Sequence, residues 1–170
     1  MRWGVDVMRH ILAVLVENQP GVLTRVSGLF SRRGYNIDSL AVGQTHDPGV
    51  SRMTIVVDGD DQVIEQVVKQ LDKLVDVIDV RDITVDEHVD RELVLIKVKA
   101  EPEIRGEIMQ IVDIFRARIV DIGQNSLIIE CTGDEGKIRA IENSLKPFGI
   151  QELVRTGMIA MVRGPKYEED

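Results

Sequence analysis

Along the first half of the chain, apolar residues follow the pattern of a strand in some segments and the spacing of a helix in others. The run from His10 to Val16 is almost wholly apolar, which predicts a buried strand. Val22, Val26, Leu29 and Phe30 then recur at helical spacing. Further strands are predicted at residues 35–45, 50–58 and 76–83, and a second helix from Asp60 or Asp61 to Leu74. The order β-α-β-β-α-β is that of the ferredoxin-like plait.

The second half repeats this pattern at about the same length. Strands are predicted at residues 92–99, 118–123, 126–132 and 150–154, and helices at 104–115 and 134–145. The run from Thr156 to Val162 is a candidate continuation of the last strand. The sequence therefore predicts an α+β protein of two tandem ferredoxin-like βαββαβ units, whose antiparallel sheets carry helices on one face.

The predicted units occupy residues 8–83 and 90–164, with a polar connector at 84–89. Residues 1–7 are expected to form a disordered extension, so that Met8 could be the native start. The polar tail at residues 165–170 is expected to be disordered as well.

A polar turn, Glu17 to Leu23 (ENQPGVL), separates the first strand from the first helix. Because the first N–H groups of a helix have no partner within it, those of Gly21, Val22 and Leu23 are expected to point outward at the positive end of the helix dipole. Such a site suits a carboxylate. The alternative is a helix start capped by Asn18 with no ligand.

The equivalent loop of the second unit contains Glu101 and Glu103, whose carboxylates would repel an anion. The two units are therefore expected to share a topology but not a ligand. Any sensing of an anionic small molecule is assigned to residues before about 85.

Composition narrows the possible partners and the compartment. The net charge of −8 argues against nucleic acid and anionic membranes as partners. No apolar run approaches the roughly 20 residues that span a bilayer. The lone cysteine, Cys131, is expected in the core, and a single cysteine favours a reducing, cytoplasmic location.

The sequence offers little catalytic chemistry, so neither catalytic nor metal-binding residues are predicted. His10, His46 and His88 have no metal-ligand spacing and are interpreted as solvated residues at element boundaries. Most of the surplus aspartates are expected in solvated turns or on outward strand faces: Asp58, Asp60, Asp61, Asp76, Asp79 and Asp82.

Other uses of the plait are disfavoured by residue type. The predicted central strands lack the aromatic residues that stack RNA bases, since they carry Ile11, Ala13, Leu15, Met53, Ile55 and Val57. A carrier of soft metals would need a cysteine pair in the first loop, where Asn18 and Gln19 stand. What remains is sensing of a small ligand with an aliphatic side chain.

Several segments resemble the regulatory small subunit of acetolactate synthase (acetohydroxyacid synthase). They are ENQPGVL (17–23), GLFSRRGYNI (28–37), SRMTI (51–55), LVDV (74–77), REL (91–93) and IFRARIVD (114–121). The resemblance covers roughly residues 8–164 and implies an N-terminal ACT domain followed by a second plait-like domain. It implies a catalytic large subunit that uses thiamine diphosphate, Mg²⁺ and usually FAD to make acetolactate from pyruvate.

The resemblance also implies that this chain has no active site or cofactor of its own. It would activate the large subunit and confer feedback inhibition by valine, or by leucine or isoleucine, in branched-chain amino acid biosynthesis. By motif, Asn18 and Gly21, with the N–H groups of Val22 and Leu23, would hold the amino acid. Asn36 and Ile37 would come from the neighbouring ACT domain across a dimer interface.

Two alternatives stay open at this point. Asn36 could be a turn residue after Gly34 and Tyr35, and the chain could be a free-standing ACT-type sensor of a different enzyme or transporter. The strand at residues 35–45 would lie at a sheet edge with Ile37, Leu40 and Val42 on it, which favours a homodimer through this edge.

Overall fold

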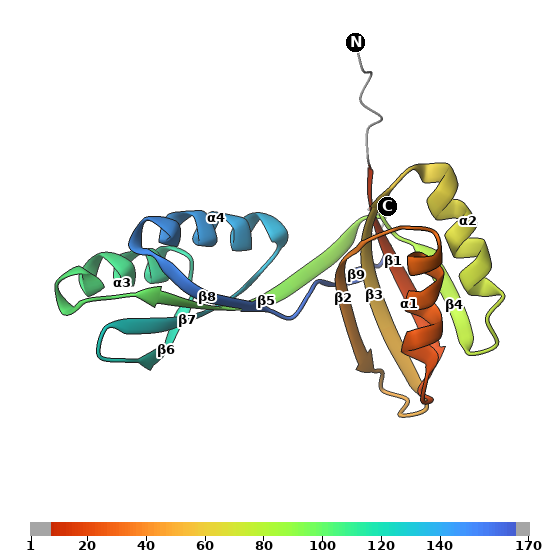
Figure 1. Cartoon of the computed structure of the whole chain (residues 1–170), viewed down its shortest axis with the longest axis horizontal. Helices are drawn as coiled ribbons and strands as arrows, with labels where there is room; N and C mark the ends of the chain where they lie inside the picture. The colour runs from red at the N-terminus through yellow and green to blue at the C-terminus, as the bar shows by residue number, and fades with distance from the viewer. Residues whose placement is uncertain (1–7, 166–170) are drawn as a thin grey trace, which may run out of the picture. The chain divides into compact units, whose positions relative to one another are not determined.

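The computed structural model describes residues 8–165 of the chain, which form two units linked by the long strand β5 (His88–Lys99) (Figure 1). The predicted extension at residues 1–7 and residues 166–170 of the predicted tail lie outside the described residues. No helix in the described range is long and apolar enough to cross a membrane.

The N-terminal unit is a four-stranded antiparallel sheet with two helices on one face (Figure 1). Its elements are β1 (Met8–Glu17), α1 (Val22–Arg32), β2 (Ile37–Gln44), β3 (Val50–Gly59), α2 (Asp61–Asp72) and β4 (Val77–Asp82). The strand order is β2-β3-β1-β4, so β1 and β3 are central and β2 is an edge. The predicted ferredoxin-like plait is confirmed.

The helix ends follow local sequence signals. Asp60 caps α2 because its carboxylate accepts the N–H of Gln62 over 2.9 Å. Helix α1 stops at Arg32, and Gly34 follows with a φ of 73°, a left-handed conformation that costs glycine least.

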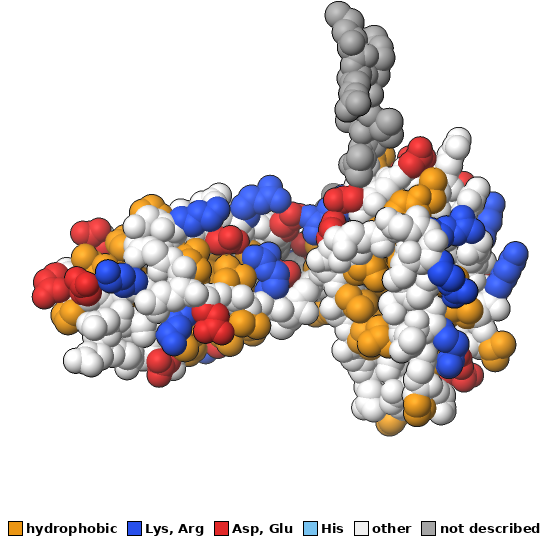
Figure 2. Space-filling view, in the orientation of Figure 1, with side chains coloured by type: hydrophobic (Ala, Val, Ile, Leu, Met, Phe, Trp, Pro, Cys, Tyr) orange, Lys and Arg blue, Asp and Glu red, His pale blue; other side chains and the backbone are white. Residues whose placement is uncertain are grey.

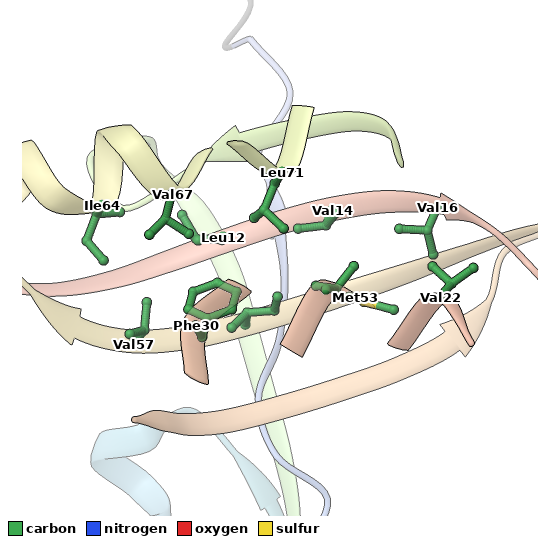
Figure 3. Packing of buried hydrophobic residues seen from close by; sticks show 12 residues of the cluster. Leu12, Val14, Val16, Val22, Phe30, Met53, Val57, Ile64, Val67 and Leu71 are labelled. Carbon is green, nitrogen blue, oxygen red and sulfur yellow. The ribbon is translucent and has the colours of Figure 1, made fainter. Parts of the chain in front are cut away.

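Aliphatic side chains from both helices and both central strands fill the space between helices and sheet. Figure 3 shows Ile64, Val67 and Leu71 of α2 projecting toward β1, with Phe30 of α1 beside Val57 of β3. Phe30, Ile64 and Leu71 are fully buried. On β1 and β3 the residues that face this core alternate with residues on the opposite face, as the two-residue repeat of a strand requires.

The C-terminal unit repeats the topology with sheet order β6-β7-β5-β8. After β5 it contains the short 3-10 helix η1 (Pro102–Ile104), α3 (Arg105–Ile114), β6 (Arg118–Ile122), β7 (Ser126–Gly133), α4 (Glu135–Leu145), the 3-10 helix η2 (Lys146–Phe148) and β8 (Ile150–Arg155). Cys131 lies in its core, as predicted, and burial raises the pKa of the thiol, an effect that the charge of Lys137 only partly offsets.

The end of the chain differs from its prediction. Residues 156–162 do not continue β8: Gly157 turns the chain with a φ of 84°, and a separate strand, β9 (Ile159–Val162), follows. From Met158 on, the chain packs with the N-terminal unit, where Met158 and Ala160 lie on the sheet face that the helices leave open. In addition, β5 begins at His88, within the connector predicted at 84–89.

Candidate functional site

The turn between β1 and α1 is shaped by Gly21. This residue precedes the helix with φ 83° and ψ −7°, and no side chain caps the helix start. The alternative in which Asn18 caps α1 is therefore wrong. Because residues other than glycine, apart from Asn and Asp, rarely adopt this left-handed backbone conformation, glycine is the residue that suits the turn.

Asn18 is held by the neighbouring β2–β3 turn instead. Its backbone N–H donates to the Gly49 carbonyl over 2.9 Å, and its Nδ2 donates to the Pro48 carbonyl over 3.1 Å. The side-chain oxygen Oδ1 accepts no hydrogen bond within residues 8–165, and the residue is exposed. Asn18 thus presents an acceptor to the solvent beside the helix start.

Two of the three N–H groups predicted to be free at the start of α1 have no acceptor within residues 8–165. The Val22 N–H points to the Gln19 carbonyl over 3.5 Å, whereas those of Gly21, Leu23 and Thr24 donate to no acceptor in the described part of the chain. The Val22 side chain is buried, and Leu23 is exposed. Three free N–H groups at the positive end of a helix dipole can donate hydrogen bonds to a carboxylate and so bind it.

Asn36 and Ile37 lie at the opposite end of the sheet from this turn. Ile37 pairs with Val57 on β3, whereas Glu17, the residue before Asn18, pairs with Val50. Seven residues of strand separate these positions, about 23 Å at 3.3 Å per residue. Asn36 is exposed, and its Nδ2 donates to Asp38 Oδ1 over 3.3 Å. One chain therefore does not bring the two parts of the predicted site together.

Arg25 is a site residue that the sequence analysis missed. Its Nε donates to Asp76 Oδ2 over 2.7 Å, and its Nη2 lies 2.5 Å from the same oxygen. The guanidinium also lies over Gly21, because a Cβ placed on that residue would be 3.1 Å from Nη1. The sequence predicts Asp76 in a solvated turn or on an outward strand face, but only 19% of its side chain is exposed. The four-residue spacing from Gly21 to Arg25 was the available signal.

Two family models match this chain. One, described as an AHAS small subunit-like ACT domain, matches residues 12–79, and the other, described as the small subunit of acetolactate synthase, matches residues 91–164. A probable acetolactate synthase small subunit from Archaeoglobus fulgidus is 60% identical over 159 residues, which are 94% of this chain and 99% of that protein. The chain belongs to the acetolactate synthase small-subunit family.

Other members agree in sequence and in structure. The acetolactate synthase small subunit of Aquifex aeolicus is 51% identical over 166 residues, which are 97% of this chain and 86% of that protein. The crystal structure of the acetolactate synthase small subunit from Thermotoga maritima superposes with a TM-score of 0.86 at 43% identity, covering 94% of this chain and 100% of that one. The similarity thus extends over both units.

In the C-terminal unit, the loop between β5 and α3 corresponds to the β1–α1 turn. The side chain of Arg105 fills this loop. Its Nε donates to the Ala100 carbonyl over 3.1 Å, and its Nη2 donates to the carbonyls of Gly123 and Gln124 over 2.6 and 2.8 Å. Glu101 lies 3.5 Å from Lys99 Nζ. The guanidinium is thus occupied by backbone acceptors, unlike the one beside Gly21.

His10 is not the solvated boundary residue that was predicted. It is 5% exposed, its Nδ1 lies 2.7 Å from Asp82 Oδ2, and its Nε2 lies 2.9 Å from Asp61 Oδ1. Despite this approach, Nε2 is buried and has no hydrogen-bond partner within residues 8–165. Burial would raise the pKa of Asp82, but hydrogen bonds from the Thr84 hydroxyl and N–H and from His10 outweigh it and lower that pKa.

Within residues 8–165, no three His, Cys, Asp or Glu side chains form a group that could hold a metal ion. The features that gather at one place are instead the free N–H groups, the Asn18 amide oxygen and the Arg25 guanidinium, all at the β1–α1 turn.

Proposed function

We propose that this chain is a regulatory subunit, without an active site of its own, that activates the catalytic large subunit of acetolactate synthase. Through it, valine or another branched-chain amino acid would inhibit acetolactate formation in branched-chain amino acid biosynthesis. Thiamine diphosphate, Mg²⁺ and FAD would belong to the large subunit, and this chain would hold none of them.

The observation that carries this proposal is the β1–α1 turn, in a chain of the acetolactate synthase small-subunit family. The free N–H groups of Gly21 and Leu23, joined by that of Thr24, would receive the carboxylate of the amino acid. The Asn18 Oδ1 atom would accept from its ammonium group. Val22 would contribute through its position in the turn, since its own N–H points to Gln19.

The second half of the site would come from another copy of the chain. Within residues 8–165, β2 pairs with β3 alone, so its outer edge is open. Val42 on this strand is 47% exposed, and hydrophobic side chains reach the surface of the N-terminal unit over β2 (Figure 2). An apolar open edge favours pairing with the same edge of a second copy.

A twofold axis would bring the separated residues into one site. If two β2 strands pair antiparallel, the start of one strand lies opposite the end of the other. The end of β2, Gln44, pairs with Ser51, and Glu17 pairs with the adjacent Val50. The partner copy's Asn36 and Ile37 would therefore lie at the end of the sheet that carries Gly21, where Ile37 could contact an aliphatic side chain.

Reconstitution with the large subunit tests the proposal. The full chain should co-purify with the large subunit, raise its rate of acetolactate formation and make that rate sensitive to valine, leucine or isoleucine. Asn36→Ala removes a polar partner of a charged ligand, a contact worth roughly 1.5–3 kcal/mol. It should raise the inhibitory concentration by about 10- to 150-fold while stimulation persists.

Asn143→Ala is the matched control, because Asn143 is an exposed asparagine of the C-terminal unit. It should leave both stimulation and inhibition unchanged. Failure to bind the large subunit would refute the proposed function. Wild-type sensitivity in Asn36→Ala would show that the effector binds elsewhere.

A further inference from the structure

The guanidinium of Arg25 has one occupied edge and one open edge. Nε and Nη2 both contact Asp76 Oδ2, whereas Nη1 has no acceptor in the described part of the chain. Nη1 is also the atom nearest to Gly21, since it would lie 3.1 Å from a Cβ on that residue. The open edge thus faces the turn that carries the free N–H groups.

Helix geometry explains why Arg25 reaches this turn. Side chains of an α-helix lean toward its N-terminus, and residues four apart lie on one face. The Arg25 N–H donates to the Gly21 carbonyl over 3.1 Å, so the two residues are one helical turn apart. Because glycine lacks a Cβ, the guanidinium can approach the backbone of the turn closely.

Asp76 holds the arginine in place from outside the helix. It lies between α2 and β4, 51 residues from Arg25 in sequence, and its backbone carbonyl accepts the Glu17 N–H over 2.8 Å. The carboxylate that binds Arg25 is therefore fixed to the last residue of β1. This anchoring limits the side-chain freedom that Arg25 would otherwise lose when a ligand binds.

We propose that Arg25, positioned by Asp76, makes the site selective for ligands with a free α-carboxylate. This inference rests on the proposed function, because it concerns the same effector. The carboxylate is bound between the N–H groups of the turn and Nη1 of Arg25, which adds a full positive charge to the helix dipole. An amino-acid amide, or an amine that carries the same side chain, lacks the negatively charged carboxylate that this arrangement recognises.

Calorimetric titration of the full chain with L-valine and with L-valinamide tests the inference. Valinamide keeps the ammonium and isopropyl groups but replaces the carboxylate by a neutral amide. The wild-type chain should bind valine at least about 10-fold more tightly than valinamide, since hydrogen bonds to charged groups are stronger than neutral ones. In Arg25→Gln this ratio should fall, and the free N–H groups of the turn account for the preference that is left.

Arg32→Gln is the matched control, because Arg32 is in the same helix but donates to the Gly28 carbonyl in the last turn. It removes the same charge and should keep the wild-type ratio. Arg25→Lys should give an intermediate ratio, since an ammonium lacks the fork that contacts Asp76 and the ligand together.

The ratio separates ligand recognition from a purely structural role, which would weaken both ligands equally. An unchanged ratio in Arg25→Gln, with valine binding intact in the wild type, would overturn the role of Arg25 alone. If the wild-type chain binds none of valine, leucine and isoleucine, the proposed effector is wrong and the role of Arg25 with it.

Discussion

The Met158 N–H donates a hydrogen bond to Ser39 Oγ over 2.8 Å, although the two residues are 119 positions apart. A second contact of the same segment joins Arg52 Nη2 to the Ala160 carbonyl, also over 2.8 Å. Through these contacts the end of the chain covers a sheet face that neither helix of the N-terminal unit reaches. Met158 and Ala160 are buried there with Ile11 and Val56.

Met158→Ala should therefore destabilise the N-terminal unit. Met158 is 5% exposed, and truncating a buried methionine costs about 2–5 kcal/mol; we expect the low end, because the cluster is small. Met161 is 67% exposed, so Met161→Ala should change the free energy of unfolding by less than about 0.5 kcal/mol. Urea unfolding followed by circular dichroism compares the two, and equal midpoints would contradict the packing of this segment.

Gly21→Ala and Gly106→Ala should change stability in opposite directions. At Gly21 the left-handed backbone costs other residues about 1–2 kcal/mol, and the new Cβ would meet Arg25 at 3.1 Å. Gly106 lies in α3 with ordinary backbone angles and nothing within 4 Å of a Cβ. Alanine there should stabilise by roughly 0.5–1 kcal/mol. Thermal unfolding of both variants tests the assignment, which fails if Gly21→Ala melts above the wild type.

The lowered pKa of Asp82 predicts a loss of stability in acid. A carboxylate whose folded pKa lies below its unfolded value stabilises the fold at higher pH. Its contribution is full above the unfolded pKa of about 3.9 and disappears as the pH falls through the folded value. Asp82→Asn should therefore reduce the drop in unfolding free energy between pH 5 and pH 3, measured in urea.

Asp86→Asn is the control for this measurement, because Asp86 is exposed on the same unit. It should keep the wild-type pH dependence. Identical pH profiles for Asp82→Asn and the wild type would show that the Thr84 and His10 contacts do not stabilise the carboxylate in solution.

Val42→Lys should prevent dimerisation if the open edge of β2 is the interface. A lysine on an edge strand opposes pairing because its charge would have to be desolvated between two sheets. Val85→Lys introduces the same charge at a side chain that is 88% exposed outside this edge, so it should remain dimeric. Light scattering at micromolar concentration distinguishes these outcomes, and a dimeric Val42→Lys would place the interface elsewhere.

Local patterns in the sequence were sufficient for the four α-helices, for most of the strands and for the duplicated topology of the described residues. Helical spacing of residues such as Val22, Val26 and Phe30 places one face of α1 in the core, and this depends only on neighbours along the chain. The cap at Asp60 and the glycine at 34 could be recognised for the same reason. The sequence also located the β1–α1 turn, because glycine before a helix is a local signal.

Only the tertiary structure decided which distant residues meet. Strand β9 has four residues, too few for its pattern to indicate a partner. In the structure it pairs with β5, while Met158 and Ala160 pack against the open face of the N-terminal sheet. His10 and Asp76 looked like solvated residues until Asp82 and Arg25 were brought beside them across long sequence separations. Sequence periodicity determines which face a residue occupies, but the pairing of charges across elements depends on how those elements pack.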